Sequence, residues 1–328
     1  MVRIAINGFG RIGRTAFKIA LDKGLDVVAV NDLTKVNELA HLLKHDSNYG
    51  TYARDVKVDG ADLIVDGKRI QGLTERDPEK LPWKALKIDV VLECTGRYTE
   101  KTDAEKHLKA GAKKVIISAP AKGGVDTLVL GVKDKSKESV LSNASCTSNC
   151  IIPVMAILEE NFGVQKAAMS TIHAYTQDQH LHDAPHTDLR RARAAAENIV
   201  PTSTGAASAT GEVLPAMKGK FDGFAFRVPV PVVSLSDFTV LTKKKVTAEQ
   251  VNDAFKKAAA SSRFKGILAV TDEPLVSSDF KGNPYSSIVD LGLTKVIDGD
   301  LVKVVSWYDN EFGYSNRLVE LAERIAKM

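Results

Sequence analysis

The chain has 328 residues, a formal net charge of +4, 44% hydrophobic residues and 26% charged residues. This length suits two domains, and the composition is that of an ordinary globular protein with a sizeable core. No apolar run approaches the roughly 18 residues that span a bilayer, and the N-terminus enters a strand-like run without the features of a signal peptide. Three cysteines, Cys94, Cys146 and Cys150, are too few for a disulfide framework, so we expect a cytoplasmic protein and no membrane partner.

The first half alternates short apolar runs with helical patterns. Val2–Asn7 and Leu25–Val30 are strand-like, and Arg11–Lys23 between them has apolar residues at helical spacing. Helical stretches such as Thr102–Ala110 lie between some of the further apolar runs, which are Asp89–Cys94, Lys114–Ser118 and Thr127–Val132. Continuous apolar strands alternating with helices predict an α/β fold with a Rossmann-type doubly wound parallel sheet.

The pattern changes in the second half. A helix-like segment, Ile151–Asn161, precedes longer strand patterns at Ala167–Tyr175 and Gly223–Leu241. The Arg-rich segment Gln177–Ser208 separates these strands, and connections of that length are usually functional. We therefore expect a second, α+β domain with a mostly antiparallel sheet, followed by a final amphipathic helix at Leu318–Ala326.

A glycine-rich turn precedes the first predicted helix. Gly8, Gly10 and Gly13 form a Gly-x-Gly-x-x-Gly directly after a strand, a pattern typical of dinucleotide binding. The glycines permit a tight turn, close approach of the backbone to a pyrophosphate, and close packing of the helix on the strand. Asp32 ends the second strand about 20 residues later, where a carboxylate binds ribose hydroxyls and repels a 2′-phosphate. The sequence thus predicts an NAD site, with an ordinary βα turn as the alternative.

Cys146 lies in the polar segment SNASCTSNC (142–150), just before the predicted helix. Ser, Thr and Asn favour N-caps, and a thiolate near a helix N-terminus is stabilised by the helix dipole. From these residues alone, Cys146 is either a nucleophile or an inert buried thiol. Pro153 predicts an irregular first turn or a kink. Cys94 and Cys150 are interpreted as small buried side chains.

Candidate partners for the cysteine and for an anion follow residue 170. His173, in a strand-like run, is either a base for the cysteine or a structural histidine. Arginines and Ser/Thr-Gly turns beyond it suit phosphate, because they offer a bidentate fork with N–H and O–H donors; a solvated basic stretch is the alternative. No aromatic residues interleave with the arginines, so we expect no dedicated nucleic-acid site. His180, His182 and His186 lack the companions of a metal site, and we expect no metal.

Many ordered motifs together resemble the phosphorylating glyceraldehyde-3-phosphate dehydrogenase family over nearly the whole chain. They are NGFGRIGR (7–14), VNDL (30–33), SAPAKG (118–123), SNASCTSNC (142–150), TIHAYTQDQ (171–179), DLRRARAAA (188–196), PTSTGAA (201–207), RVPVP (227–231) and WYDNEFGYSNR (307–317). The resemblance implies an NAD-binding Rossmann domain at residues 1–147 with 312–328, and a catalytic domain at residues 148–311. It also implies a glycolytic homotetramer that uses NAD and inorganic phosphate to convert D-glyceraldehyde 3-phosphate into 1,3-bisphosphoglycerate.

The same resemblance implies roles for matching residues. Cys146 is similar to the thiol that forms the family's thioester, and His173 to its general base. Besides the three glycines, the residues similar to NAD contacts are Arg11, Ile12, Asp32, Arg76, Ser118 and Asn310. Residues similar to those holding the substrate's C3 phosphate are Thr176, Arg191 and Arg227. Residues similar to the site of the attacking inorganic phosphate are Ser145, Thr147, Thr204 and Gly205, with Arg227 close to both sites.

Three other readings remain at this point: an erythrose-4-phosphate dehydrogenase, a semialdehyde dehydrogenase, and a nucleotide- or RNA-binding module without catalysis. The residues matching the inorganic-phosphate site favour the phosphorylating enzyme, and retention of Cys146 and His173 opposes the module. Ala184 stands before Pro185 where NAD-specific members usually carry Leu-Pro, which is half of the change found in dual-cofactor members. Asp32 and Leu33 still favour NAD.

Overall fold

The computed structural model describes residues 1–327, and its internal contacts divide the chain into two compact units. The first unit contains Met1–Leu128, Lys135–Ala144 and the chain from Ser315 onward. The second contains Val129–Asp134 and Ser145–Tyr314. The sequence prediction placed the changes of domain after residues 147 and 311, and it did not anticipate that Val129–Asp134 packs with the second unit.

The first unit is built on a nine-stranded sheet in the order β10-β11-β9-β8-β1-β2-β7-β6-β5, counted over the described residues. Its strands are Arg3–Asn7 (β1), Asp26–Asn31 (β2), Val56–Asp59 (β5), Asp62–Val65 (β6), Lys68–Leu73 (β7), Val90–Glu93 (β8), Lys114–Ile117 (β9), Asp126–Thr127 (β10) and Val140–Ser142 (β11). The strands from β10 to β7 are parallel, and β6 and β5 extend the sheet antiparallel. The order reverses between β1 and β8, which confirms the predicted doubly wound topology.

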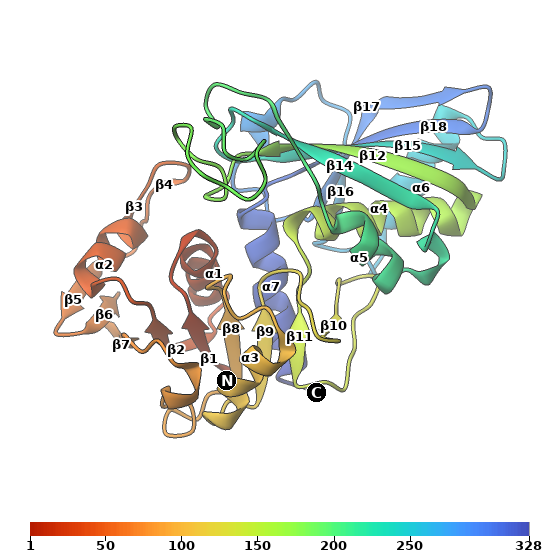
Figure 1. Ribbon diagram of the computed structural model, residues 1–328. Helices are drawn as coiled ribbons and strands as arrows, with labels where there is room; N and C mark the ends of the chain where they lie inside the picture. The colour runs from red at the N-terminus through yellow and green to blue at the C-terminus, as the bar shows by residue number, and fades with distance from the viewer. Residues whose placement is uncertain (328) are drawn as a thin grey trace. The chain divides into compact units, whose positions relative to one another are not determined.

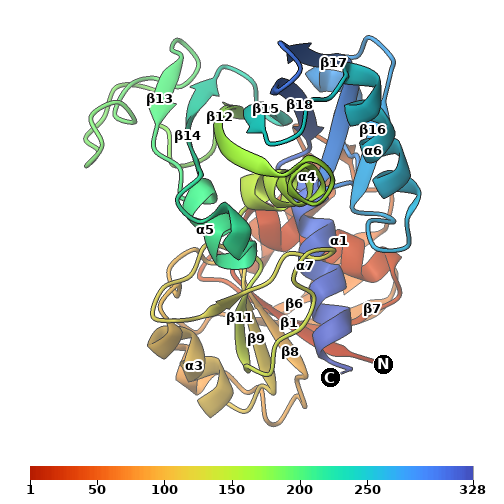
Figure 2. The same cartoon turned by 90° about the vertical axis from the view of Figure 1, so that its right-hand side faces the viewer.

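Helices cover both faces of this sheet. They are α1 (Arg11–Asp22), α2 (Val36–Lys44), α3 (Lys101–Lys109) and α7 (Phe312–Ile325), with a small hairpin, β3 (His45–Asp46) and β4 (Gly50–Thr51), after α2. Figure 2 shows α1 and α3 on opposite faces of the sheet. Helix α1 connects β1 to β2 and α3 connects β8 to β9, so the two connections run in opposite directions along the sheet. Because both crossovers are right-handed, their helices lie on opposite faces. Strand β8 is buried along its whole length, which explains its continuous apolar sequence.

One predicted strand of the first half is mostly wrong. Of Thr127–Val132, only Thr127 lies in a strand, at the end of β10. Gly131 has a φ of +86°, and the Lys133 N–H donates to the Val129 carbonyl at 2.8 Å across the resulting turn. The apolar residues Leu128–Leu130 are buried without extending the sheet. Burial alone therefore produced a strand-like pattern at a turn.

The second unit contains a seven-stranded sheet in the order β13-β14-β12-β15-β18-β17-β16, again counted within residues 1–327. Its strands are Val164–Ala174 (β12), Val200–Thr202 (β13), Phe221–Val228 (β14), Ser234–Thr242 (β15), Leu268–Thr271 (β16), Ser287–Ile297 (β17) and Leu301–Tyr308 (β18). Only the pairs β12–β14 and β16–β17 are parallel, so the predicted mostly antiparallel sheet is confirmed. The predicted run Gly223–Leu241 divides into β14 and β15 around Pro229 and Pro231, which cannot donate to a ladder.

Helices α4 (Cys146–Phe162), α5 (Ala206–Val213) and α6 (Ala248–Ala260) complete this unit, as Figure 1 shows. Helix α4 begins earlier than predicted and continues through Pro153 without interruption. Its first turn is regular, with the Asn149 N–H donating to the Ser145 carbonyl at 3.0 Å. Of the two alternatives predicted for Pro153, the irregular first turn is therefore not observed, and the kink stays a prediction. Almost complete burial of the helix stabilises it beyond what its own hydrogen bonds provide.

A buried polar network joins strands and helix in the first unit. The Glu93 carboxylate accepts from Asn7 Nδ2 at 2.6 Å and lies 3.0 Å from His107 Nε2. The Trp83 Nε1–H donates to His107 Nδ1 at 2.9 Å, so His107 carries its proton on Nε2 and donates it to Glu93. His107, Trp83 and Glu93 are all within 1% of full burial.

We predict that His107→Leu lowers the free energy of unfolding by about 3 kcal/mol, because it leaves the Trp83 N–H and a Glu93 oxygen buried without this partner. Urea-induced unfolding checks this. His41→Leu, which changes an exposed histidine of α2 in the same unit, serves as the matched control. Equal unfolding midpoints for the two variants would show that the network contributes little.

Candidate active site

Cys146 is the first residue of α4, so its thiol lies in the first turn of a long helix. Ser145 is the N-cap, and its Oγ accepts from the Ser148 N–H at 3.0 Å. Ala144, just before it, has a φ of +54°, a left-handed conformation that is costly for a residue with a Cβ. This sharp entry ends β11 and starts the helix at the cysteine, where the helix dipole favours negative charge.

His173, on β12, is the nearest base to this thiol. Its Nε2 lies 3.4 Å from Cys146 Sγ, and its Nδ1 lies 2.6 Å from the Ala174 carbonyl oxygen. Nδ1 also lies 2.8 Å from Arg227 Nη1. The shorter contact is the one with the carbonyl, so we assign the proton to Nδ1, which leaves the Nε2 lone pair facing the thiol. Arg227 Nη1 donates to the same carbonyl at 3.0 Å. The two residues that the sequence paired as nucleophile and base are therefore in contact.

Burial governs the charge of this pair. Desolvation, and then the positive charge of Arg227, lower the pKa of His173 to about 3. Desolvation raises the pKa of Cys146, although Arg227 and a hydrogen bond with Thr147 act in the opposite direction. Burial thus opposes the thiolate that the helix dipole and Arg227 favour, and it opposes a charged imidazole in the same way.

Tyr308, on β18, is a site residue that the sequence reasoning missed. Its OH lies 3.0 Å from Thr147 Oγ1, and its ring meets that of His173 edge-on with centroids 6.0 Å apart. Burial raises the pKa of Tyr308 well above its usual value, so the phenol stays protonated. The available signal was its place in the WYDNEFGYSNR motif, which does not by itself say that the ring reaches α4.

The other two cysteines differ from Cys146 in their surroundings. Burial raises the pKa of both Cys94 and Cys150 to about 12. Cys150 Sγ lies 3.9 Å from Ser287 Oγ, deep between α4 and the sheet. Burial therefore disfavours the thiolate, which is the nucleophilic form, at both positions.

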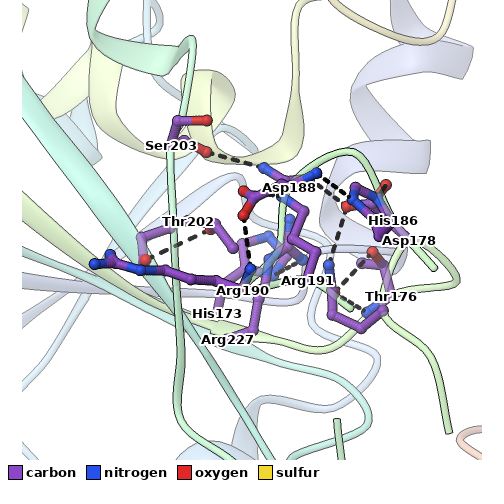
Figure 3. A network of polar contacts seen from close by, with 12 residues as sticks. His173, Thr176, Asp178, His186, Asp188, Arg190, Arg191, Thr202, Ser203 and Arg227 are labelled. Carbon is purple, nitrogen blue, oxygen red and sulfur yellow. Dashed lines mark hydrogen bonds and ion pairs between the residues drawn. The ribbon is translucent and has the colours of Figure 1, made fainter. Parts of the chain in front are cut away.

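The residues expected at the substrate phosphate lie together in one network of polar contacts, drawn in Figure 3. Thr176 directly follows β12, and Arg191 lies in the long segment between β12 and β13. Arg227 lies opposite His173 in the parallel pair β12–β14, with Nη1 2.8 Å from His173 Nδ1. The base and the expected phosphate ligands thus belong to one sheet edge and the segment beside it.

The residues expected at the inorganic phosphate surround the starts of two helices. Ser145 and Thr147 belong to the first turn of α4. Thr204 and Gly205 precede α5, where Thr204 Oγ1 accepts from the Ala206 N–H at 3.2 Å and Gly205 is the N-cap. Helix N-termini with hydroxyl neighbours offer N–H and O–H donors to an anion.

The glycine-rich turn of the first unit has the geometry of a dinucleotide site. Gly8 has a φ of +91°, and a Cβ on Gly13 would lie 2.1 Å from the Gly8 carbonyl oxygen, whereas a Cβ on Gly10 would meet nothing within 4 Å. Helix α1 begins at Arg11 without a side-chain cap, so its first N–H groups can donate to the oxygens of a pyrophosphate. Asp32 Oδ2 accepts from the Phe9 N–H at 2.7 Å, which places the acid beside the turn.

The remaining expected cofactor residues lie around the carboxyl ends of the strands or in the other unit. Arg11, in the first turn of α1 with Ile12, is ion-paired with Asp46 at 3.0 Å. Ser118 follows β9 and Arg76 follows β7, both in the first unit. Asn310 follows β18 in the second unit, and its Oδ1 accepts from Ser234 Oγ at 3.0 Å.

Residues 1–327 lack two features. None of their helices combines the length and apolarity that a membrane crossing requires. No three or more of their His, Cys, Asp and Glu side chains are grouped so as to hold a metal ion.

Comparison with known proteins gives full-length similarity. Residues 2–101 match the family model for the glyceraldehyde 3-phosphate dehydrogenase NAD binding domain, and residues 145–310 match that for the C-terminal domain. The chain is 56% identical to the glyceraldehyde-3-phosphate dehydrogenase of Geobacillus stearothermophilus over 99% of its length and 98% of that protein. It is 52% identical to the enzyme of Borreliella burgdorferi, over 99% and 100% of the two chains. Glyceraldehyde-3-phosphate dehydrogenase 1 of Bacillus subtilis is 54% identical, over 99% and 98%.

We predict that Gly13→Ala and Gly10→Ala separate the two roles of glycine in this turn, which are close packing of the helix on the strand and access for the pyrophosphate. The new Cβ at position 13 meets a backbone oxygen, so this variant loses thermal stability as well as NAD affinity. The Cβ at position 10 points into open space, so Gly10→Ala retains its melting temperature and loses only affinity, because it obstructs the pyrophosphate. Differential scanning calorimetry and NAD titration calorimetry measure the two effects. A Gly13→Ala variant with unchanged melting temperature would contradict this assignment.

Proposed function

The chain belongs to the glyceraldehyde-3-phosphate dehydrogenase family, and from its geometry we propose how its residues carry out that reaction. The activity is the NAD-dependent oxidation and phosphorylation of glyceraldehyde 3-phosphate in glycolysis. The observation that carries the proposal is the 3.4 Å contact between Cys146 Sγ and His173 Nε2. It joins a nucleophile at a helix N-terminus to a base whose tautomer is set by the Ala174 carbonyl.

Cys146 is the nucleophile of the first step. Its sulfur attacks the aldehyde carbon while its proton passes through His173 to the former carbonyl oxygen, giving a hemithioacetal. His173 is neutral again and accepts the hydroxyl proton when the hemithioacetal is oxidised to the thioester. The hydride acceptor that this oxidation requires is the chemistry that NAD supplies when it is bound at the glycine-rich turn. Inorganic phosphate then attacks the thioester carbon, the carbon–sulfur bond breaks to release the acyl phosphate, and the departing Cys146 thiolate takes back the proton held by His173.

The arginines and hydroxyls hold the two anions. Thr176, Arg191 and Arg227 bind the C3 phosphate of the substrate. The inorganic phosphate is bound by Ser145, Thr147, Thr204 and Gly205. What supports this division is that the first group adjoins His173, while the second lies at the N-termini of α4 and α5. Holding both reactants beside one sulfur converts bimolecular encounters into local steps.

Glyceraldehyde 3-phosphate oxidation followed as NADH formation, with and without inorganic phosphate, tests this assignment. We expect phosphate-dependent turnover in the wild type and none in Cys146→Ser. His173→Asn should lower kcat by roughly 10²- to 10⁴-fold, because the general base is lost. Cys150→Ser, four residues further along α4 and away from the base, is the matched control and should remain active.

Turnover that does not depend on phosphate would instead indicate a hydrolysing relative such as an erythrose-4-phosphate dehydrogenase. Full activity of Cys146→Ser would overturn the thioester mechanism itself.

We also propose a cytoplasmic homotetramer. The Arg-rich segment exposes Leu181, Leu189 and Ile199 to 80%, 81% and 68%, which is typical of a surface that another chain covers. All three cysteines are free, as expected in a reducing compartment. Light scattering on purified protein should give four times the 35.5 kDa chain mass; a monomer would contradict the assembly.

A further inference from the structure

We propose that Ser234 is a positioning residue for the nicotinamide end of NAD, because its hydroxyl fixes the direction in which the Asn310 amide points. This inference rests on the proposed oxidation at Cys146 and on Asn310 as a cofactor residue. Ser234 was not among the expected site residues. It is the first residue of β15 and is 2% exposed.

The sheet places Ser234 between the general base and the end of β18. Its strand runs antiparallel to β18, with Ser234 opposite Tyr308, two residues before Asn310. On its other side β15 pairs with β12, the strand of His173. All of these residues belong to the second compact unit, so one folded sheet sets their positions.

The Ser234 hydroxyl makes two hydrogen bonds, and the first decides the sense of the second. The Ala174 N–H donates to Ser234 Oγ at 3.0 Å, so the oxygen acts there as an acceptor. The hydroxyl has one proton to donate, and it donates this proton to Asn310 Oδ1 at 3.0 Å. If the Asn310 amide were turned over, the buried serine proton would lose its acceptor, which is costly. Ser234 therefore holds Oδ1, and not Nδ2, toward itself.

The amide nitrogen of Asn310 is left for a ligand. Holding Oδ1 at Ser234 directs Nδ2 away from the serine. Nδ2 donates to no acceptor within residues 1–327, yet it is not one of their fully buried atoms that lack a partner. It therefore remains accessible, although Asn310 as a residue is only 5% exposed. A fixed N–H2 group with two donors suits an acceptor such as a carboxamide oxygen.

The place of Asn310 indicates which part of the cofactor it meets. In the proposed oxidation a hydride leaves the carbon bonded to Cys146 Sγ, and this transfer requires the nicotinamide ring beside Cys146 and His173. Ser234 joins Asn310 to the N–H of Ala174, the residue after His173. The carbonyl of Ala174 contacts the His173 ring at 2.6 Å. One hydroxyl thus holds both the backbone beside the base and the amide that faces the nicotinamide.

The backbone around Asn310 is held separately, so Ser234 controls the side chain alone. Asp309 is fully buried, and its carboxylate accepts from the N–H groups of Glu311 and Phe312 at 3.0 and 2.8 Å. These bonds fix the turn between β18 and α7. Removal of the Ser234 hydroxyl should therefore free the Asn310 amide without displacing the turn.

The test compares two ligands by titration calorimetry, NAD and ADP-ribose, which lacks the nicotinamide. For Ser234→Ala we expect NAD to bind about fivefold more weakly, as for the loss of one uncharged hydrogen bond, and ADP-ribose to bind within about twofold of the wild type. The matched control is Ser236→Ala, since Ser236 lies two residues along the same strand, on the same face, and is buried. Its hydroxyl contacts Thr171 Oγ1 at 3.0 Å, so its loss should change neither affinity.

A second variant, Ser234→Cys, keeps the test valid if Ser234→Ala does not fold. A thiol has nearly the shape of the hydroxyl but is a weak donor and acceptor, so this variant should show the same ligand-dependent loss. Equal losses for NAD and ADP-ribose would rule out the positioning role, because a general disturbance of the site affects both ligands alike.

Asn310→Ala separates this inference from the proposed function. If Asn310→Ala weakens binding of NAD but not of ADP-ribose, while the Ser234 variants bind both as the wild type does, the positioning role is wrong and Asn310 stands as a cofactor residue. If Asn310→Ala shows no such selectivity, the assignment of Asn310 and the inference fail together. The thioester mechanism at Cys146 is tested independently, by turnover of Cys146→Ser.

Discussion

The register of the parallel pair β12–β14 is the constraint on which the catalytic unit depends. It places His173 directly opposite Arg227, and β15 and β18 extend the alignment to Ser234 opposite Tyr308. Because side chains alternate along a strand, a slip of one residue would turn His173 to the other face of the sheet. The positions of His173, Arg227 and Tyr308 are therefore set by backbone pairing across the sheet, before any contact between their side chains.

The same sheet face explains how α4 is positioned. One part of the face carries apolar side chains such as Phe238 and Val302, which pack under the helix. Toward the start of α4 the sheet face carries hydroxyl groups instead. The hydroxyls of Ser287 and Ser306 form a hydrogen bond of 2.7 Å with one another, beside Cys150. The apolar part of the sheet face stabilises α4 by burial. The hydroxyl part offers hydrogen bonds to polar groups near the N-terminus of α4, where Cys146 is the first residue.

Burial at this end has a chemical consequence. Burial raises the pKa of Cys146 and lowers that of His173, so it favours the uncharged form of each group. Burial raises the pKa of Cys94 and Cys150 as well. What distinguishes Cys146 is the imidazole nitrogen 3.4 Å from its sulfur.

The sequence by itself determined the parts of this protein that depend on local spacing. The turn of Gly8 and Gly13, the two sheet types and the pairing of Cys146 with His173 were all predictable, because turns, strand patterns and family motifs are readable along the chain. The motif resemblance also predicted Arg191 and Arg227 as site residues, but it did not predict which side chains they contact.

Only the tertiary structure decided contacts between residues far apart in sequence, or within a segment that has no regular pattern. Tyr308 reaches Thr147 because β18 and α4 pack together, and Asp178 reaches Arg191 because an irregular segment folds back on itself. The direction of the Cys146 pKa depends on how much water the packed site excludes, which no local pattern encodes. The same limit explains the mistaken strand at Thr127–Val132, where apolar residues were buried at a turn rather than in a sheet.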